Sequence, residues 1–210
     1  MTFTLRPYQA RATDAAKEFL RQSIDPCLID ASPAAGKSYM VAEMANWFRE
    51  VSGGKRVLCL QPNSKLVKQN VQKFQLTGER CSIFSASAGT KSTRHPVIYA
   101  TPLTVKNSIS RFLRDYCAII LDEAHTLAPT HLEIIEAMRD ANPNLRILGL
   151  TGTSYRMLKG YIFRMWPDGR VNTDETTRDP FFSKMVYRVS AEEMLGEGFI
   201  TPMEIRPVND

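Results

Sequence analysis

The sequence has no apolar run long enough to cross a membrane, since about 18 consecutive apolar residues are needed and no run in the 210 residues approaches that length. Its first seven residues also lack the basic and then apolar pattern of a secretion signal. Cysteine is scarce: Cys27, Cys59, Cys81 and Cys117 are widely separated and form no Cys-x-x-Cys pair. This spacing argues against a zinc site, and we interpret the four as small apolar core residues in a reducing compartment. We therefore expect a cytoplasmic protein with no membrane partner.

The composition suits one large domain, or one domain with an appendage, because 210 residues can bury a sizeable core. Hydrophobic residues make up 43% of the chain, which is ordinary for a globular protein. The net charge of +5 is compatible with a polyanionic partner but does not require one.

One stretch carries a strong chemical signal. An apolar run at residues 27–30 leads into a loop of small residues, then into Gly36-Lys37-Ser38 and a helical pattern. This order is typical of a phosphate-binding P-loop, in which backbone N–H groups and the next helix N-terminus hold an anion. We expect Lys37 to reach the β- and γ-phosphates and the Ser38 hydroxyl to hold Mg²⁺. Ala31 replaces the usual first glycine, so we expect a tighter start of the loop, because alanine adopts a positive φ only at a cost. The alternative is a strand-turn-helix corner with an accidental Gly-Lys-Ser.

Short apolar segments alternate with helical patterns along the chain. Strands are predicted at residues 27–30, 56–60, 81–84, 97–100, 117–121 and 145–150, and helices at residues 7–22, 40–48, 64–74, 103–113 and 132–138. This alternation predicts an α/β fold, a parallel sheet with helices on both faces. Ligands of such sheets bind at the carboxyl ends of the strands. Residues 85–94, rich in Ser, Ala, Gly and Thr, are expected to form a flexible loop.

A second chemical motif, Asp122-Glu123-Ala124-His125, directly follows the strand at residues 117–121. At that position Asp122 is suited to hold Mg²⁺, partly through water, opposite Ser38. Glu123 is suited to orient and activate a water molecule. We expect His125 to link these groups to neighbouring polar side chains. The alternative is an acidic cap at the end of a strand.

Two weaker patterns belong to the same expected edge. Thr151-Gly152-Thr153 follows the strand at residues 145–150, where its hydroxyls could bond to the acidic cluster and transmit its state. Without the other motifs, it would be interpreted simply as a turn. Gln9 lies at the start of the helix at residues 7–22, and its amide both donates and accepts, which suits N6 and N7 of adenine.

In this order the motifs resemble those of the superfamily 2 helicases and translocases, over nearly the whole chain. The matching segments are residues 5–9 (the adenine-reading Q motif), 34–38 (motif I), 61–69 (motif Ia), 100–102 (motif Ib), 122–125 (the DEAH box) and 148–156 (motif III). Gly152 and Ser154 replace the alanine and proline usual in motif III. Beyond it, Arg156 and Gly160, the phenylalanines at 181–182 and the segment 198–202 are similar in order to the bacterial RadD-like branch.

The resemblance implies a first RecA-like motor domain whose nucleotide contacts are Arg6, Gln9, Ala34, Ala35, Gly36, Lys37 and Ser38. It implies three parts: residues 1–154 as the ATP-binding domain, 155–190 as a basic and aromatic insertion or hairpin, and 191–210 leading to a second RecA-like domain. Motifs IV to VI are not found, and the chain ends at Asp210. We therefore expect binding of ATP and Mg²⁺ but poor hydrolysis, because the second domain's arginine finger is worth roughly 10³–10⁵ in rate.

Motifs Ia and Ib of the family contact the phosphates of one strand, which implies nucleic-acid contacts from Pro62, Asn63, Ser64, Lys65, Thr101 and Pro102. DNA is the expected partner, as a single strand or fork, and RNA is possible. Residues 154–190 carry seven Lys or Arg against four Asp or Glu, with Tyr155, Tyr161, Phe163 and Trp166 among them. They could stack a single strand, or form a hairpin that packs its aromatics on the sheet edge, with Asp168-Gly169 as its turn.

The leading hypothesis is an ATP-dependent DNA helicase or translocase domain in repair, recombination or restriction, encoded by a bacterium or phage. The alternatives are the translocating motor subunit of a restriction or remodelling complex, and an ATP-gated nucleic-acid-binding or adaptor module without turnover. A P-loop kinase is disfavoured, since a water-activating Glu123 beside Asp122 suits hydrolysis.

Overall fold

The computed structural model describes residues 4–201. Expectations for residues 1–3, for Pro202 and for the rest of 202–210 lie outside the described residues. The elements are α1 (Pro7–Gln22), β1 (Cys27–Ala31), α2 (Lys37–Val51), β2 (Arg56–Leu60), α3 (Ser64–Gln75), β3 (Cys81–Ser85), β4 (Thr90–Lys91), β5 (Val97–Ala100), α4 (Pro102–Lys106), the 3₁₀ turns η1 (Ile109–Phe112) and η2 (Ala124–Thr126), β6 (Tyr116–Asp122), α5 (Pro129–Ala141), β7 (Arg146–Thr151), β8 (Tyr155–Arg156), β9 (Gly160–Tyr161), β10 (Phe163–Met165), β11 (Phe182–Val189) and α6 (Ala191–Gly196). Every helix in this part of the chain is too short or too polar to cross a bilayer.

A nine-stranded sheet in the order β10-β11-β1-β7-β6-β2-β5-β3-β4 forms the centre of the molecule. Its strand pairs are parallel, apart from the antiparallel pair β3–β4 at one edge. β8 and β9 form a separate antiparallel pair. The fold class predicted from the sequence, a parallel sheet in an α/β domain, is confirmed.

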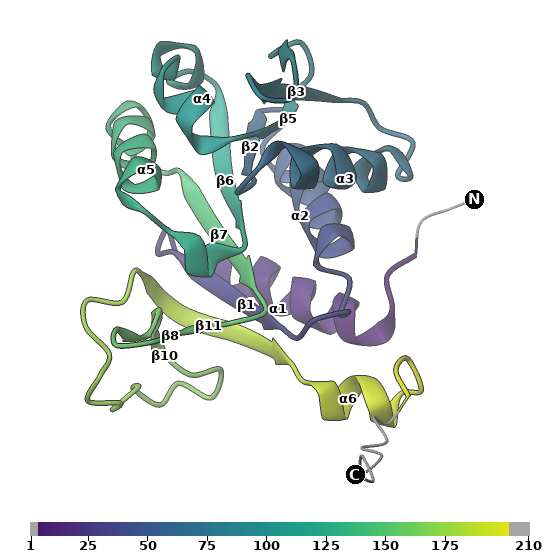
Figure 1. Ribbon diagram of the computed structural model, residues 1–210, viewed down its shortest axis with the longest axis vertical. Helices are drawn as coiled ribbons and strands as arrows, with labels where there is room; N and C mark the ends of the chain where they lie inside the picture. The colour runs from purple at the N-terminus through teal and green to yellow at the C-terminus, as the bar shows by residue number, and fades with distance from the viewer. Residues whose placement is uncertain (1–3, 202–210) are drawn as a thin grey trace, which may run out of the picture.

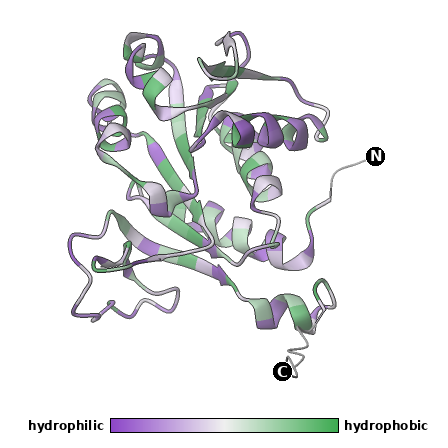
Figure 2. Ribbon diagram, in the orientation of Figure 1, coloured by the Kyte–Doolittle hydropathy of each residue, from purple (hydrophilic) through white to green (hydrophobic). Residues whose placement is uncertain are grey.

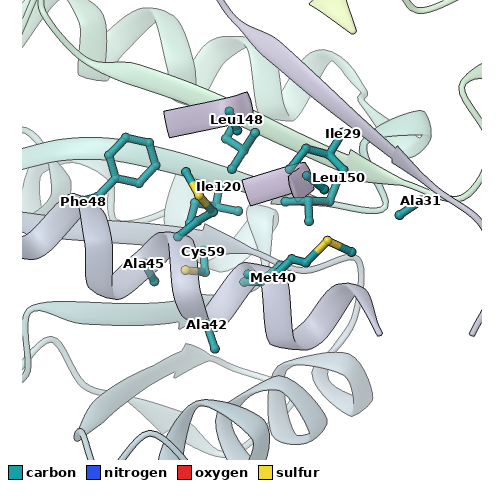
Figure 3. Packing of buried hydrophobic residues seen from close by; sticks show 14 of the residues in the cluster. Ile29, Ala31, Met40, Ala42, Ala45, Phe48, Cys59, Ile120, Leu148 and Leu150 are labelled. Carbon is teal, nitrogen blue, oxygen red and sulfur yellow. The ribbon is translucent and has the colours of Figure 1, made fainter. Parts of the chain in front are cut away.

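Helices cover both faces of the sheet. In Figure 1, α4 and α5 lie on one side of the strands and α1, α2 and α3 on the other. Each face has its own apolar cluster, one built with α1, α2 and α3 and the other with α4 and α5. Figure 3 shows Met40, Ala45 and Phe48 of α2 against strand residues such as Ile120 and Leu148. Strands buried on both faces are continuously apolar, and Figure 2 shows hydrophobic residues concentrated along the central strands.

Two predicted segments differ from the structure. The single helix expected at residues 103–113 is α4 followed by the 3₁₀ turn η1, with Asn107 and Ser108 between them. Both residue types compete with the helix for backbone hydrogen bonds, which explains the break. The loop expected at residues 85–94 is in part a hairpin, because Ser85 pairs with Thr90 and Gly89 supplies a positive φ of 77° at the turn.

The sequence did not predict β11 as a strand of the main sheet. β11 lies within the 155–190 segment interpreted as an insertion or hairpin, yet it pairs in parallel with β1. Lys184 and Arg188 interrupt its apolar pattern, so the segment lacks the continuous apolar run that predicts a buried strand. A strand from the end of the described chain is therefore the direct neighbour of the strand that leads into the P-loop.

Of the two accounts of the aromatic residues, the structure agrees with hairpin packing. Trp166 N–H donates to the Arg170 carbonyl at 2.9 Å across the Asp168-Gly169 turn. The ring centroids of Tyr161 and Phe163 lie 5.3 Å and 4.9 Å from that of Trp166. Phe163 is fully buried. These rings complete the core beneath α5 and the sheet edge, and Phe163 has no free face for a base.

Candidate active site

The P-loop joins β1 to α2. Ala31, the residue in place of the usual glycine, is the last residue of β1 and pairs with Val189. Its φ is not positive; the left-handed residues are Ala34, at 68°, and Gly36, at 74°. The expected constraint at Ala31 is therefore wrong, because the turn lies three residues later, where Ala34 carries the conformational cost.

Gln9 of α1 lies against this loop. Its Nε2 donates to the Ala35 carbonyl at 2.8 Å, and its Oε1 accepts from the Arg6 N–H at 2.9 Å. A Cβ on Gly36 would lie 2.5 Å from Gln9 Nε2. The amide predicted to meet adenine thus also holds the loop, and Gly36 is required by both its φ and this close approach.

Three adjacent strands bring the P-loop, the acidic motif and the Thr-Gly-Thr motif to one edge of the sheet. β7 pairs with β1 on one side, where Asp30 is opposite Thr151, and with β6 on the other, where Asp122 is opposite Leu150. Lys37 begins α2, and its Nζ lies 3.5 Å from Glu123 Oε1. A cation and a carboxylate from separate motifs therefore face each other at the carboxyl ends of the strands.

Asp122 is the last residue of β6 and is 7% exposed. Its Oδ1 accepts the Glu123 N–H at 3.0 Å, and its Oδ2 accepts Nδ2 of Asn70 at 2.8 Å. Burial raises the pKa of this carboxyl, and the negative charge of Glu123 adds to the effect, while the Asn70 hydrogen bond opposes it. A bound cation would stabilise the charged form of this carboxylate, because little solvent is available to do so.

Asn70 was missed by sequence analysis. This side chain from α3 is fully buried, and its Nδ2 also donates to Gln61 Oε1 at 2.7 Å. Gln61 directly follows β2 and is the first residue of the motif Ia segment. One amide therefore connects the acidic motif with the start of that segment. The available signal was an asparagine on the helix face that also carries Val67, Val71 and Phe74.

His125 connects the acidic motif to the Thr-Gly-Thr motif. Its Nδ1 lies 2.9 Å from Thr151 Oγ1 and 3.4 Å from Glu123 Oε2. Thr151 is buried, and its hydroxyl donates to the Thr153 carbonyl at 3.1 Å. Thr153 N–H in turn donates to that hydroxyl at 3.1 Å. These contacts form a continuous chain from Glu123 through His125 to the loop after β7.

A second polar cluster lies one residue before the end of β1. Asp30 Oδ2 accepts from Ser154 Oγ and from Arg188 Nε, both at 2.9 Å. Asp30 and Ser154 are buried. Ser154 stands where proline is usual in motif III, and its hydroxyl satisfies a buried carboxylate that proline could not reach. Sequence analysis missed this cluster, because its members come from three distant segments.

The candidate nucleic-acid residues divide by exposure. Asn63 and Lys65 are exposed, and the Asn63 side chain caps α3 by accepting from Leu66 N–H at 3.0 Å. Pro62 and Ser64 are half-buried beside them. Thr101 and Pro102 are buried, and the Thr101 hydroxyl bonds within the protein to Ser85 and Thr104. The accessible side chains of this group are therefore those that begin α3.

The residues of the P-loop and the acidic motif fit Mg²⁺ and a nucleotide. Ser38 lies in the first turn of the 15-residue helix α2, next to Lys37. Among residues 4–201 no group of three or more His, Cys, Asp or Glu side chains could hold a metal ion alone. Mg²⁺ commonly takes one or two carboxylates and completes its shell with water and phosphate oxygens, so Asp122 with Ser38 is a suitable donor set.

A family model described as "Type III restriction enzyme, res subunit" matches residues 2–156. No curated protein matches the chain significantly by sequence.

Solved structures with the same fold include helicases and restriction enzymes. A nuclease-deletion mutant of the type ISP restriction-modification enzyme LlaGI, in complex with a DNA substrate mimic, aligns with a TM-score of 0.63 at 14% identity, covering 94% of this chain and 21% of that one. UvsW helicase of bacteriophage T4 gives a TM-score of 0.60 at 18% identity, covering 88% and 60%. The Hef helicase domain of Pyrococcus furiosus gives 0.59 at 23% identity, covering 72% and 34%. The RecA-like helicase fold is thus confirmed, while the chain spans from about a fifth to three-fifths of these proteins.

Proposed function

The chain belongs to the family of the type III restriction enzyme res subunit, and from this premise we propose that it is the first motor domain of an ATP-dependent DNA helicase or translocase. The observation that carries the proposal is the 3.5 Å approach of Lys37 Nζ to Glu123 Oε1 at the carboxyl edge of the sheet. For hydrolysis of a γ-phosphate, a phosphate-binding lysine and a water-orienting carboxylate must both reach that phosphate, and their proximity here supports this. In the proposal, residues 122–125 are a DEAH box, and the tail belongs to the RadD-like branch.

Each residue of the site has a proposed task. Lys37 contacts the β- and γ-phosphates, with backbone N–H groups of Ala34, Ala35 and Gly36 around them. Ser38 and Asp122 hold Mg²⁺, which neutralises charge that develops on the phosphates. Glu123 orients the attacking water and accepts its proton.

Arg6 and Gln9 recognise the base in this proposal. Gln9 retains one amide hydrogen and one carbonyl lone pair beyond its bonds to Ala35 and Arg6. Those two groups are the complement of adenine N7 and N6. Because the same amide holds the P-loop, base recognition and phosphate binding would be coupled through one side chain.

His125, Thr151 and Thr153 transmit the state of the site in this proposal. Their bonds run from Glu123 to the loop after β7. The nucleic-acid track comprises Pro62, Asn63, Ser64, Lys65, Thr101 and Pro102, and the exposed Asn63 and Lys65 support contact with phosphates. DNA, as a single strand or fork, is the proposed partner.

The proposed division of the chain keeps residues 1–154 as the motif-bearing part and 155–190 as an edge segment of the same domain. Residues 191–210 lead to a second RecA-like domain, which supplies the arginine finger. The family match also supports a second version, in which the motor translocates within a restriction complex without separating strands.

ATP hydrolysis by the chain, and by a longer protein in which a second RecA-like domain follows, tests this function. Each is measured alone and with single-stranded DNA, duplex DNA and RNA. We expect weak turnover by the chain and polymer-stimulated turnover by the longer protein, abolished by Lys37→Ala. Tight nucleotide binding with no turnover in either protein would replace the motor by an ATP-gated binding module.

A further inference from the structure

A cleft of about 540 Å³ opens between α5 and the segment that runs from β8 to the start of β11. The segment from β8 to β11 that lines it lies below α5 in Figure 1. The P-loop, residues 122–125 and the motif Ia and Ib residues do not line it. The cleft is therefore separate from both proposed binding sites.

The charged residues that line the cleft are mostly basic. Its basic lining residues are Arg139, Arg156, Lys159, Arg164 and Arg178, and the acidic lining residue is Asp179. The Asp179 side chain is fully exposed and reaches Arg164 only at 3.9 Å. An exposed pair at that distance neutralises little charge.

Protein groups leave this charge largely uncompensated. Arg156 donates to the carbonyls of Leu127 and Ala124, Arg139 to that of Ile24, and Arg164 to that of Pro180. Carbonyl oxygens accept hydrogen bonds but carry no net charge. Lys159 and Arg178 are exposed, and their side chains form no hydrogen bond or ion pair with residues 4–201.

The fold holds these two free cations together. Arg178 N–H donates to the Lys159 carbonyl at 3.3 Å. Next to Lys159, a Cβ on Gly160 would lie 2.4 Å from the Thr177 backbone, so only glycine permits this approach. These contacts bring the backbones of the two residues together, and both side chains line the same cleft, where like charges repel each other. A polyanion would relieve the repulsion.

We propose that this cleft binds the phosphodiester backbone of the nucleic acid, as an anchor outside the motif Ia and Ib track. The aromatic residues that line it, Tyr161 and Phe181, pack on other rings, so the cleft offers charge and few base-stacking faces. Contacts of this kind position a nucleic acid without reading its sequence. The N-terminus of the 13-residue helix α5 also lines the cleft and adds partial positive charge.

Arg156 places the anchor next to the proposed ATPase site. It holds the carbonyls of Ala124 and Leu127, which flank the end of the acidic motif. A strand bound in the cleft would therefore lie beside the connection from residues 122–125 to α5. This inference rests on the proposed nucleic-acid partner but not on ATP turnover.

The test is anisotropy of labelled duplex and single-stranded DNA, titrated with the chain over a series of salt concentrations. The double variant Lys159→Gln/Arg178→Gln removes two charges that make no side-chain contact in the described protein, so folding should be retained. We expect binding to weaken roughly tenfold at low salt, equally for different sequences, and the slope of log K against log salt to become shallower by about 2. The matched control Arg80→Gln/Arg94→Gln removes two exposed charges elsewhere and should change neither quantity.

Asp179→Asn gives an effect of the opposite sign. It removes the acidic group of the cleft and should tighten binding severalfold, which a folding defect could not do. Unchanged affinity and slope in the Gln/Gln variant, with wild-type binding intact, would overturn the anchor and leave the proposed function standing. Absence of binding to any nucleic acid by the wild-type chain would overturn both.

Discussion

Nδ2 of Asn70 lies 2.8 Å from Oδ2 of Asp122, so a side chain from α3 holds the buried carboxylate at the end of β6. The same nitrogen lies 2.7 Å from Oε1 of Gln61. The carboxylate proposed to hold Mg²⁺ and Gln61, the residue just before the proposed nucleic-acid track, therefore share one hydrogen-bond donor. Because both segments bond to this nitrogen, a displacement of either one would alter the hydrogen bonding of the other.

Asn70→Leu should destabilise the chain by about 2 kcal/mol at neutral pH, because a buried hydrogen bond to a charged group is lost. The loss should shrink in acid. The folded-state pKa of Asp122 is raised above its ordinary value of 3.8, so as pH falls through that folded pKa the carboxyl becomes neutral and needs the donor less. Urea unfolding at several pH values measures this. Gln69→Leu, an exposed neighbour on α3, is the control, and a loss that does not vary with pH would contradict the assignment.

Gly36→Ala should cost roughly 1–3 kcal/mol, because it forces an L-residue to a φ of 74°. It should also abolish nucleotide binding, since the new Cβ would meet Gln9 Nε2. Gly36→Ala/Gln9→Ala relieves this contact but not the backbone strain, so stability should return only in part. Thermal unfolding and binding of a fluorescent ATP analogue measure the two effects. Wild-type stability in the single variant would be inconsistent with the left-handed conformation.

Glu123→Gln should preserve nucleotide binding and remove hydrolysis in the longer, two-domain protein. The amide keeps the shape of the side chain but cannot accept a proton from water. Lys37→Ala should instead abolish binding, because the phosphates lose their cation. Single-turnover hydrolysis beside equilibrium nucleotide binding separates the two variants. Normal turnover by Glu123→Gln would remove Glu123 from its proposed task.

Ser154→Ala should destabilise the chain by about 1 kcal/mol, since Asp30 loses one of its two close donors. Asp30→Asn, made alone and combined with Ser154→Ala, completes a double-mutant cycle, with an expected coupling of about 0.5–3 kcal/mol for residues in contact. Chemical denaturation of the four proteins gives the coupling. Strictly additive losses would mean that the 2.9 Å contact contributes nothing to stability.

The sequence by itself determined the features that depend on neighbours along the chain. Nearly continuous apolar runs marked β1, β2, β5, β6 and β7, because strands buried on both faces are apolar at most positions. Lys37 and Ser38 follow Gly36 directly into α2, while Asp122 ends β6 and Glu123 follows it, so spacing alone placed both motifs next to strand ends. Parallel strands then required these ends to share one edge.

Only the tertiary structure decided which side chains meet across that edge and beyond it. Asn70 and Asp122 are 52 residues apart, and Arg188 and Asp30 are 158 apart. Their contacts depend on strand order, and above all on β11 pairing with β1, which no local pattern of residues encodes. Burial of apolar surface holds Phe163 and Phe182 of the 155–190 segment in the core, while cations of the same segment line the cleft. Hydrophobic packing over long sequence separations therefore decided where the charges of this protein converge.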